Sequence, residues 1–141
     1  MIEWIQNFFS GVIPKLLLNA TLETLYMTFV STALAFILGL VLAIVLILTR
    51  RGGLCENRIV YAVLDVVINT LRSFPFIILL IVLFPLTKLL VGTSIGTTAA
   101  IVPLTIGSAP FIARLIESAL LEVDSGVIEA AKSFGASKTQ I

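Results

Sequence analysis

Residues 24–49 read TLYMTFVSTALAFILGLVLAIVLILT, a stretch without a single charged side chain. Glu23 precedes it and Arg50 follows it. A transmembrane helix needs about 20 apolar residues to cross the hydrocarbon core of a bilayer, which is about 30 Å thick. The stretch therefore predicts a membrane-spanning helix that ends at the basic turn Arg50-Arg51-Gly52-Gly53.

The composition of the whole chain is that of a membrane protein. Hydrophobic residues make up 59% of its 141 residues, charged residues 12%, and the mean hydropathy is +1.16. Soluble domains are about half apolar and about a quarter charged. The net charge of +1 gives no indication of nucleic-acid binding. With no histidine and only one cysteine, Cys55, we expect a single all-α membrane domain with no catalytic site, metal or cofactor.

Two further segments predict membrane spans, at about residues 66–88 and 95–113. Residues 73–87 are uncharged but reach only about 22 Å as a helix. The span must therefore extend into the residues at one end or the other, and Arg72 lies close to one interface. Asp65 and Arg72 are seven positions apart and share a helix face. Polar, proline and glycine residues in such spans either line a translocation path or allow tight helix packing. The candidates for these two roles are Asn69, Arg72, Pro75, Pro103, Gly107 and Pro110.

The charges in the loops predict the orientation of the spans. The loop at residues 50–58 carries three arginines and one glutamate, whereas residues 1–20 have the composition of an extracytoplasmic or interfacial segment anchored by Trp4. Because cytoplasmic loops are enriched in lysine and arginine, we expect the N-terminus outside and Arg50-Arg51 in the cytoplasm. After three spans, the C-terminal segment is expected in the cytoplasm as well.

Residues 124–141 predict a short amphipathic helix outside the membrane. Asp124 or Ser125 is a suitable N-cap, the helix is expected over about residues 126–134, and Gly135 suits a left-handed residue at its end. Ser137 and Gln140 have the spacing of a capping box that opens another helix. Such a helix either lays its apolar face into a groove on a partner or rests on the membrane surface. That face would consist of Val127, Ile128, Ala131 and Phe134.

Several parts of the chain resemble known transport proteins. Residues 129–135, EAAKSFG, have the pattern E-A-A-x-x-x-G and resemble the signature loop of bacterial ABC-importer permeases. Residues 24–31 look like the opening of the first span of type I ABC-importer permeases. Residues 69–80, NTLRSFPFIILL, resemble the methionine group of these permeases. Further runs similar to the methionine group lie at residues 91–96, 99–107 and 109–114, so the resemblance covers about residues 22–141.

The resemblance implies a non-catalytic permease subunit of an ATP-driven importer of methionine, in its L- and D-forms, in the bacterial inner membrane. It implies a type I transmembrane domain over residues 21–141 and a homodimer of permeases. It also implies two ATP-binding subunits that hydrolyse ATP, and an extracytoplasmic methionine-binding lipoprotein. Membrane lipid surrounds the spans. The residues expected to contact the ATP-binding subunit are Glu129, Ala130, Ala131 and Gly135.

This permease group has five spans, of which we expect three here, and its signature loop continues to an I-x-L-P sequence that is absent from the chain. The resemblance therefore implies an N-terminal portion that does not transport alone. Two other functions stay open at this point. One is a permease for another amino acid, and the other is a small autonomous membrane protein that oligomerises without an ATPase. Co-purification with an ATP-binding subunit separates the last of these from the permeases.

Overall fold

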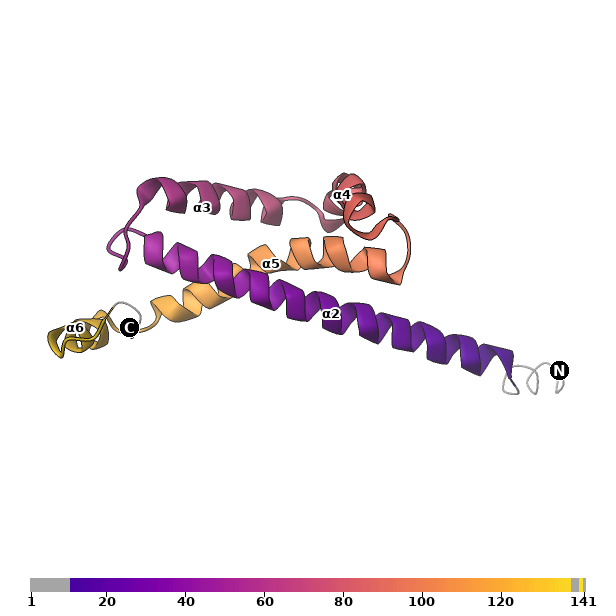
Figure 1. Cartoon of the computed structure of the whole chain (residues 1–141), viewed down its shortest axis with the longest axis horizontal. Helices are drawn as coiled ribbons and strands as arrows, with labels where there is room; N and C mark the ends of the chain where they lie inside the picture. The colour runs from indigo at the N-terminus through magenta and orange to yellow at the C-terminus, as the bar shows by residue number, and fades with distance from the viewer. Residues whose placement is uncertain (1–10, 138–139, 141) are drawn as a thin grey trace.

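The computed structural model describes residues 11–137 and 140, and the secondary structure within these residues is entirely helical. The expected all-α class is therefore confirmed. Figure 1 shows α2 as a long rod with α5 lying along it, while α3 runs back over the same region and α4 turns across. The helices are α2 (Val12–Thr49), α3 (Arg58–Ser73), α4 (Phe76–Val91), α5 (Thr97–Leu121) and α6 (Ser125–Ser133).

Among the described residues, α2 and α5 are the two single helices that are long and apolar enough to cross a membrane. A third crossing requires α3 and α4 to act together as one broken span. The three spans expected from the sequence require this pair to form one crossing.

α2 begins earlier than the expected first span. It has 38 residues, or about 57 Å at 1.5 Å per residue, and is thus longer than the bilayer core is thick. Residues 12–20 continue the helix of the first expected span, so α2 has no break at the expected domain boundary near residue 20. Pro14 lies in the first turn, where a missing backbone N–H breaks no helical hydrogen bond. Residues 1–10, including Trp4, lie outside the described residues.

The expected span at residues 66–88 corresponds to parts of two helices, α3 and α4. The chain bends by 113° between α3 and α4. The cause is Pro75, whose ring disfavours the helical conformation for the residue before it. Phe74 is accordingly extended, with φ −77° and ψ 135°, and α4 starts directly after Pro75. Each helix has 16 residues and reaches only about 24 Å, so neither crosses the bilayer by itself.

A seam of small residues joins α2 to α5. On α2, Ser31, Ala35, Gly39 and Ala43 recur at every fourth position, and on α5 Thr105, Ala109 and Ala113 do the same. A Cβ atom placed on Gly39 would lie 2.8 Å from Ile112 Cγ2 and 3.0 Å from the Ala109 carbonyl oxygen. Ridges of residues four apart pack into each other's grooves, and small residues let the backbones approach closely. We call these seven residues the small-residue seam.

Three contacts along the two helices show that α2 and α5 run in the same direction. Near the start of both helices, the Thr97 hydroxyl donates to Glu23 Oε2 at 3.1 Å. One step along, the Thr105 hydroxyl contacts the Ser31 carbonyl oxygen at 3.5 Å. Near the end of α2, Leu46 is buried with Ala113 of α5 and Ile68 of α3. The chain must therefore return between α2 and α5, which α3 and α4 accomplish.

α5 starts close to the expected residue 95 but continues to Leu121, beyond the expected end at residue 113. Pro103 and Pro110 lie inside it without interrupting it, and both are buried. The longer helix carries Arg114 and Glu117 as a direct continuation of the span. The outer surface of the bundle exposes large apolar side chains along α2, among them Phe29, Phe36 and Ile37, as expected for a surface that contacts lipid or further membrane helices.

A larger side chain at Gly39 tests whether the close approach at the small-residue seam stabilises the fold. Gly39→Leu should force α2 and α5 apart and destabilise the chain by about 1–3 kcal/mol, the usual range for overpacking a dense core. The measurement is the midpoint temperature at which the purified chain in detergent loses its monodisperse peak. Val41→Leu is the matched control, since Val41 is 54% exposed on the same helix. Equal midpoints for the two variants would show that the Gly39 approach does not stabilise the fold.

Candidate functional site

The helix that carries the E-A-A pattern forms as expected from its sequence. α6 covers Ser125–Ser133, within one residue of the expected bounds. Asp124 is the N-cap, and its Oδ1 accepts a hydrogen bond from the Gly126 N–H at 2.6 Å. A short turn connects α6 to α5, so the direction in which α5 leaves the membrane determines where α6 lies.

Gly135 ends α6 in a left-handed conformation, with φ +81°, which confirms the expectation for this residue. The Gly135 N–H donates to the Lys132 carbonyl at 3.0 Å and the Ala136 N–H donates to the Ala131 carbonyl at 3.1 Å. These two bonds are those of a Schellman motif, which satisfies the last carbonyl groups of a helix and turns the chain sharply. The space around a Cβ atom at Gly135 is open. The backbone conformation alone therefore favours glycine here.

The surface of α6 has no cover from the rest of the described chain. Glu129 and Ala130 are exposed and Ala131 is partly exposed. On the apolar face, Val127 is 63% exposed and Phe134 is 91% exposed. A phenylalanine this exposed in water is unfavourable unless another surface covers it. α6 thus presents an apolar face flanked by charged side chains.

The segment after Gly135 shows part of the expected capping box. The Ser137 N–H donates to Gln140 Oε1 at 2.8 Å, which is the reciprocal bond of that motif. Lys138, Thr139 and Ile141 lie outside the described residues, so the helix expected to start here is not described.

A cluster of polar and charged side chains joins α5 to α3. Arg114 forms an ion pair with Asp65 of α3 through Nη2, and with Glu117 Oε2 through Nη1 at 2.7 Å. Arg114 Nη2 also contacts Asn69 Oδ1 at 3.3 Å. The side chains of Arg114 and Glu117 are only 17% and 6% exposed, and that of Asp65 is 35% exposed. We call Asp65, Asn69, Arg114 and Glu117 the charge cluster.

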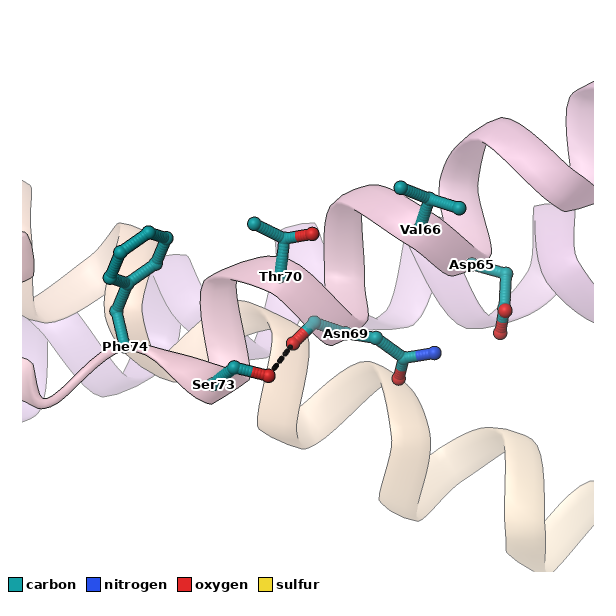
Figure 2. Close-up of a pocket in the computed structure, with 6 residues that line it drawn as sticks. All are labelled: Asp65, Val66, Asn69, Thr70, Ser73 and Phe74. Carbon is teal, nitrogen blue, oxygen red and sulfur yellow. Dashed lines mark hydrogen bonds between the residues drawn. The ribbon is translucent and has the colours of Figure 1, made fainter.

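Figure 2 shows how α3 distributes its polar side chains. Asp65 and Asn69 point to the side on which α5 lies, whereas Val66 and Thr70 point the other way. These residues, with Ser73 and Phe74, line an open hollow of about 380 Å³. The Ser73 hydroxyl donates to the Asn69 carbonyl oxygen at 2.7 Å. α3 therefore carries polar groups on its outer side as well as toward α5.

Arg72 does not join the charge cluster, although it shares a helix with Asp65. It is exposed and borders a second hollow of about 250 Å³ together with Phe76, Gly107 and Phe111. A Cβ atom on Gly107 would lie 3.1 Å from the Phe76 ring. Gly107 thus permits the close contact between α4 and α5 beside Arg72.

The three candidate prolines fall into two different settings. Pro103 and Pro110 are buried within α5, a position that suits helix packing. Pro75 is exposed at the bend between α3 and α4. A role of Pro75, or of any of the six candidates, in a translocation path stays a prediction. Among residues 11–137 and 140, no group of three acidic or cysteine side chains is placed to hold a metal ion.

Sequence reasoning did not find the interhelical part of the charge cluster. The pairing of Arg114 with Glu117 follows from their spacing on one helix. The pairing of Arg114 with Asp65 joins residues 49 positions apart and depends on how α3 packs against α5. The available signal was the presence of opposite charges at the edges of two spans, since such charges usually pair inside the bundle.

Comparison with known proteins finds long and close similarity. The "Probable D-methionine transport system permease protein MetI" of Vibrio cholerae is 56% identical over 126 residues, covering 89% of this chain and 56% of the relative. The "D-methionine transport system permease protein MetI" of Escherichia coli strain K12 is 50% identical over 126 residues, covering 89% of this chain and 58% of the relative. The chain thus spans somewhat more than half the length of these curated relatives.

Solved structures agree with the sequence relatives. A chain from "Inward facing conformations of the MetNI methionine ABC transporter" aligns with a TM-score of 0.86 at 47% identity, covering 93% of this chain and 62% of that one. A chain from an amino acid ABC transporter crystallised with histidines aligns with a TM-score of 0.62 at 24% identity. The second match shows a shared fold.

The match to a described protein family settles the classification. Residues 46–141 match the family described as binding-protein-dependent transport system inner membrane component. This range includes α3, α4, α5, α6 and the whole charge cluster. The chain therefore belongs to the family of binding-protein-dependent transport inner membrane components.

Proposed function

We propose that the chain is part of the membrane permease subunit of an ATP-driven importer of methionine. The observation that carries the proposal is the exposed, capped helix α6, which follows the membrane helix α5 directly and ends in a sharp turn at Gly135. The relatives are transport permeases, so in this proposal a partner subunit hydrolyses the ATP. The permease itself is a non-catalytic, multi-pass component of the bacterial inner membrane.

The proposed partner at α6 is the ATP-binding subunit. Val127 and Phe134 offer an uncovered apolar face, and Glu129 and Lys132 add charges beside it. An amphipathic helix of this kind fits a groove on a soluble protein. In this proposal Glu129, Ala130 and Ala131 lie at the contact, and Gly135 sets the turn. The related transporter solved as MetNI supports such an arrangement, because it is an ABC transporter.

The proposed substrate is methionine in its D- and L-forms. The D-methionine permeases of Vibrio cholerae and Escherichia coli support it at 56% and 50% identity. A second copy of the permease would complete the path, and an extracytoplasmic methionine-binding lipoprotein would deliver the substrate. In the assembled dimer, Asn69, Arg72 and Pro75 are proposed to face the path, and Gly107 to border it. Pro103 and Pro110 then support the path by packing.

The proposed orientation places the N-terminus outside and α6 in the cytoplasm. Figure 1 shows the loop after α2 and the helix α6 at the same end of the molecule, and the start of α2 at the other end. That loop holds Arg50 and Arg51, and Arg58 begins α3 directly after it, which favours the cytoplasmic side. α6 then lies on the side of the membrane where ATP is available.

A transport assay tests the proposed function. We define the completed permease as residues 1–141 fused to the C-terminal remainder of the Vibrio cholerae relative, co-expressed with the ATP-binding subunit of that transport system. Proteoliposomes with this complex and the methionine-binding protein should take up radiolabelled methionine in an ATP-dependent manner. Residues 1–141 alone should not, because polar side chains such as Arg72 would face lipid without partner helices.

Three results of this assay would contradict the proposal. Uptake of a different amino acid without methionine uptake would reject the substrate. Failure of the completed permease to retain the ATP-binding subunit would reject the permease function. Uptake by residues 1–141 alone would show that no further membrane helices are needed.

Cys55 provides a native probe of the orientation. It is exposed in the loop after α2, so a membrane-impermeant maleimide should label it only after permeabilisation of the cells. In a Cys55→Ser background, Ala20→Cys near the start of α2 should be labelled from outside intact cells. Labelling of Cys55 in intact cells would reverse the proposed orientation.

Gly135 allows a sharp test of the contact with the ATP-binding subunit. In the completed permease, Gly135→Val should weaken retention of that subunit about tenfold, since a left-handed backbone costs a residue with a Cβ atom about 1–2 kcal/mol. Gly135→Asn is the matched control, because asparagine tolerates this conformation. Retention is measured as the amount of ATP-binding subunit recovered per permease after affinity purification. Equal recovery for the two variants would show that the turn does not matter for docking.

A further inference from the structure

The charged members of the charge cluster, Asp65, Arg114 and Glu117, have no role in the proposed contact with the ATP-binding subunit or in the proposed path. The charge cluster connects α3 with α5, which the chain separates by the bend at Pro75, helix α4 and the short loop at residues 92–96. On one side, α5 continues from Arg114 to Leu121 and leads into α6. On the other side, α3 continues from Asp65 to Ser73 and leads into the bend at Pro75.

The geometry of the cluster depends on a guanidinium group. The two terminal nitrogens of Arg114 take different partners, since Nη1 bonds Glu117 and Nη2 bonds both Asp65 and Asn69. A lysine ammonium is a single point charge and does not reproduce this planar fork. Arg114 therefore holds a residue of its own helix and two residues of α3 at the same time.

Burial makes the cluster sensitive to the loss of one member. Glu117 has a 6% exposed side chain, and within residues 11–137 and 140 the one basic side chain that forms an ion pair with it is Arg114. A buried charge whose partner is removed stays uncompensated, which is far more costly than the loss of a surface ion pair. The rest of the α3–α5 contact is apolar and small, formed around Ile68 and Ala113. Apolar contacts allow sliding, whereas the charge cluster fixes the register of α3 against α5.

We propose that the charge cluster is a mechanical latch that makes α3 move with α5 when the ATP-binding subunit displaces α6. This inference rests on the proposed function. Displacement of α6 pulls on the end of α5, Arg114 carries the displacement to Asp65, and α3 passes it to the bend at Pro75. The bend borders the hollow formed by Arg72, Phe76 and Gly107. Asp65 and Arg114 are thus positioning residues for transport, without contact to ATP.

The experiment compares uptake with ATP hydrolysis in the completed permease. Asp65→Asn keeps the shape of the side chain and removes its charge, and Arg114→Lys keeps a charge and removes the fork. Each should lower methionine uptake about tenfold, within the range typical of coupling between two sites. ATP hydrolysis by the recovered complex should stay near the unsubstituted rate. Both quantities are measured on the same proteoliposomes and normalised to recovered complex.

Two further variants separate coupling from simple stability. Asp65→Glu keeps the carboxylate, and the open hollow beside Asp65 leaves room for it, so uptake should recover. Arg58→Lys is the matched control for Arg114→Lys, since Arg58 is exposed on the same helix as Asp65, and it should behave like the unsubstituted permease.

The outcomes distinguish the latch from its alternatives. Normal uptake by Asp65→Asn and Arg114→Lys would overturn the latch. A parallel fall of uptake, hydrolysis and complex recovery, without rescue by Asp65→Glu, would assign the cluster to folding alone and also overturn it. Failure of the proposed function is recognised separately, because the unsubstituted completed permease would then not transport methionine.

Discussion

The fold depends on the close parallel approach of α2 and α5 at the small-residue seam. Inside a bilayer the apolar solvent gives helices little reason to associate, so packing between backbones must supply the attraction. Gly39 makes that approach possible, because any side chain there would overlap Ile112 and Ala109. Ala35, Ala43 and Ala113 are completely buried beside it. Larger side chains at these positions would leave α5 without a defined place on α2.

The parallel arrangement determines the rest of the topology. α2 and α5 end at the same side of the molecule, so the arginine-rich loop and α6 lie at one end (Figure 1). The chain between them has to return across the bilayer, and it does so in two pieces that meet at Phe74 and Pro75, where the proline disfavours the helical conformation of the residue before it. A broken pair has a structural advantage for a transporter, since its bend is a place where motion can be absorbed without breaking helical hydrogen bonds.

The sequence predicted those features that depend on neighbouring residues. The uncharged stretch of the first span, the Asp124 cap and the left-handed Gly135 are all local properties, and the structure contains them as expected. The bend at Pro75 was missed because proline is tolerated in many membrane helices, and only packing against α5 decides between a kink and a break. The pairing of Arg114 with Asp65 was missed for a related reason. Both residues flank expected spans, but the sequence pattern does not say which helices become neighbours.

The contrast between α6 and the charge cluster shows how the two parts of the site differ physically. α6 has nine residues, too few for an isolated helix to be stable in water, and most of its apolar face remains uncovered. Its caps define its ends, but a partner surface has to provide the remaining stabilisation. The charge cluster instead forms its ion pairs within the described chain, because Arg114 pairs with Asp65 of α3 and with Glu117 of its own helix. The uncovered apolar face of α6 suits binding and release of a partner, whereas the ion pairs inside the chain suit the transmission of force. The part of α5 from Arg114 to Leu121 connects the charge cluster to α6.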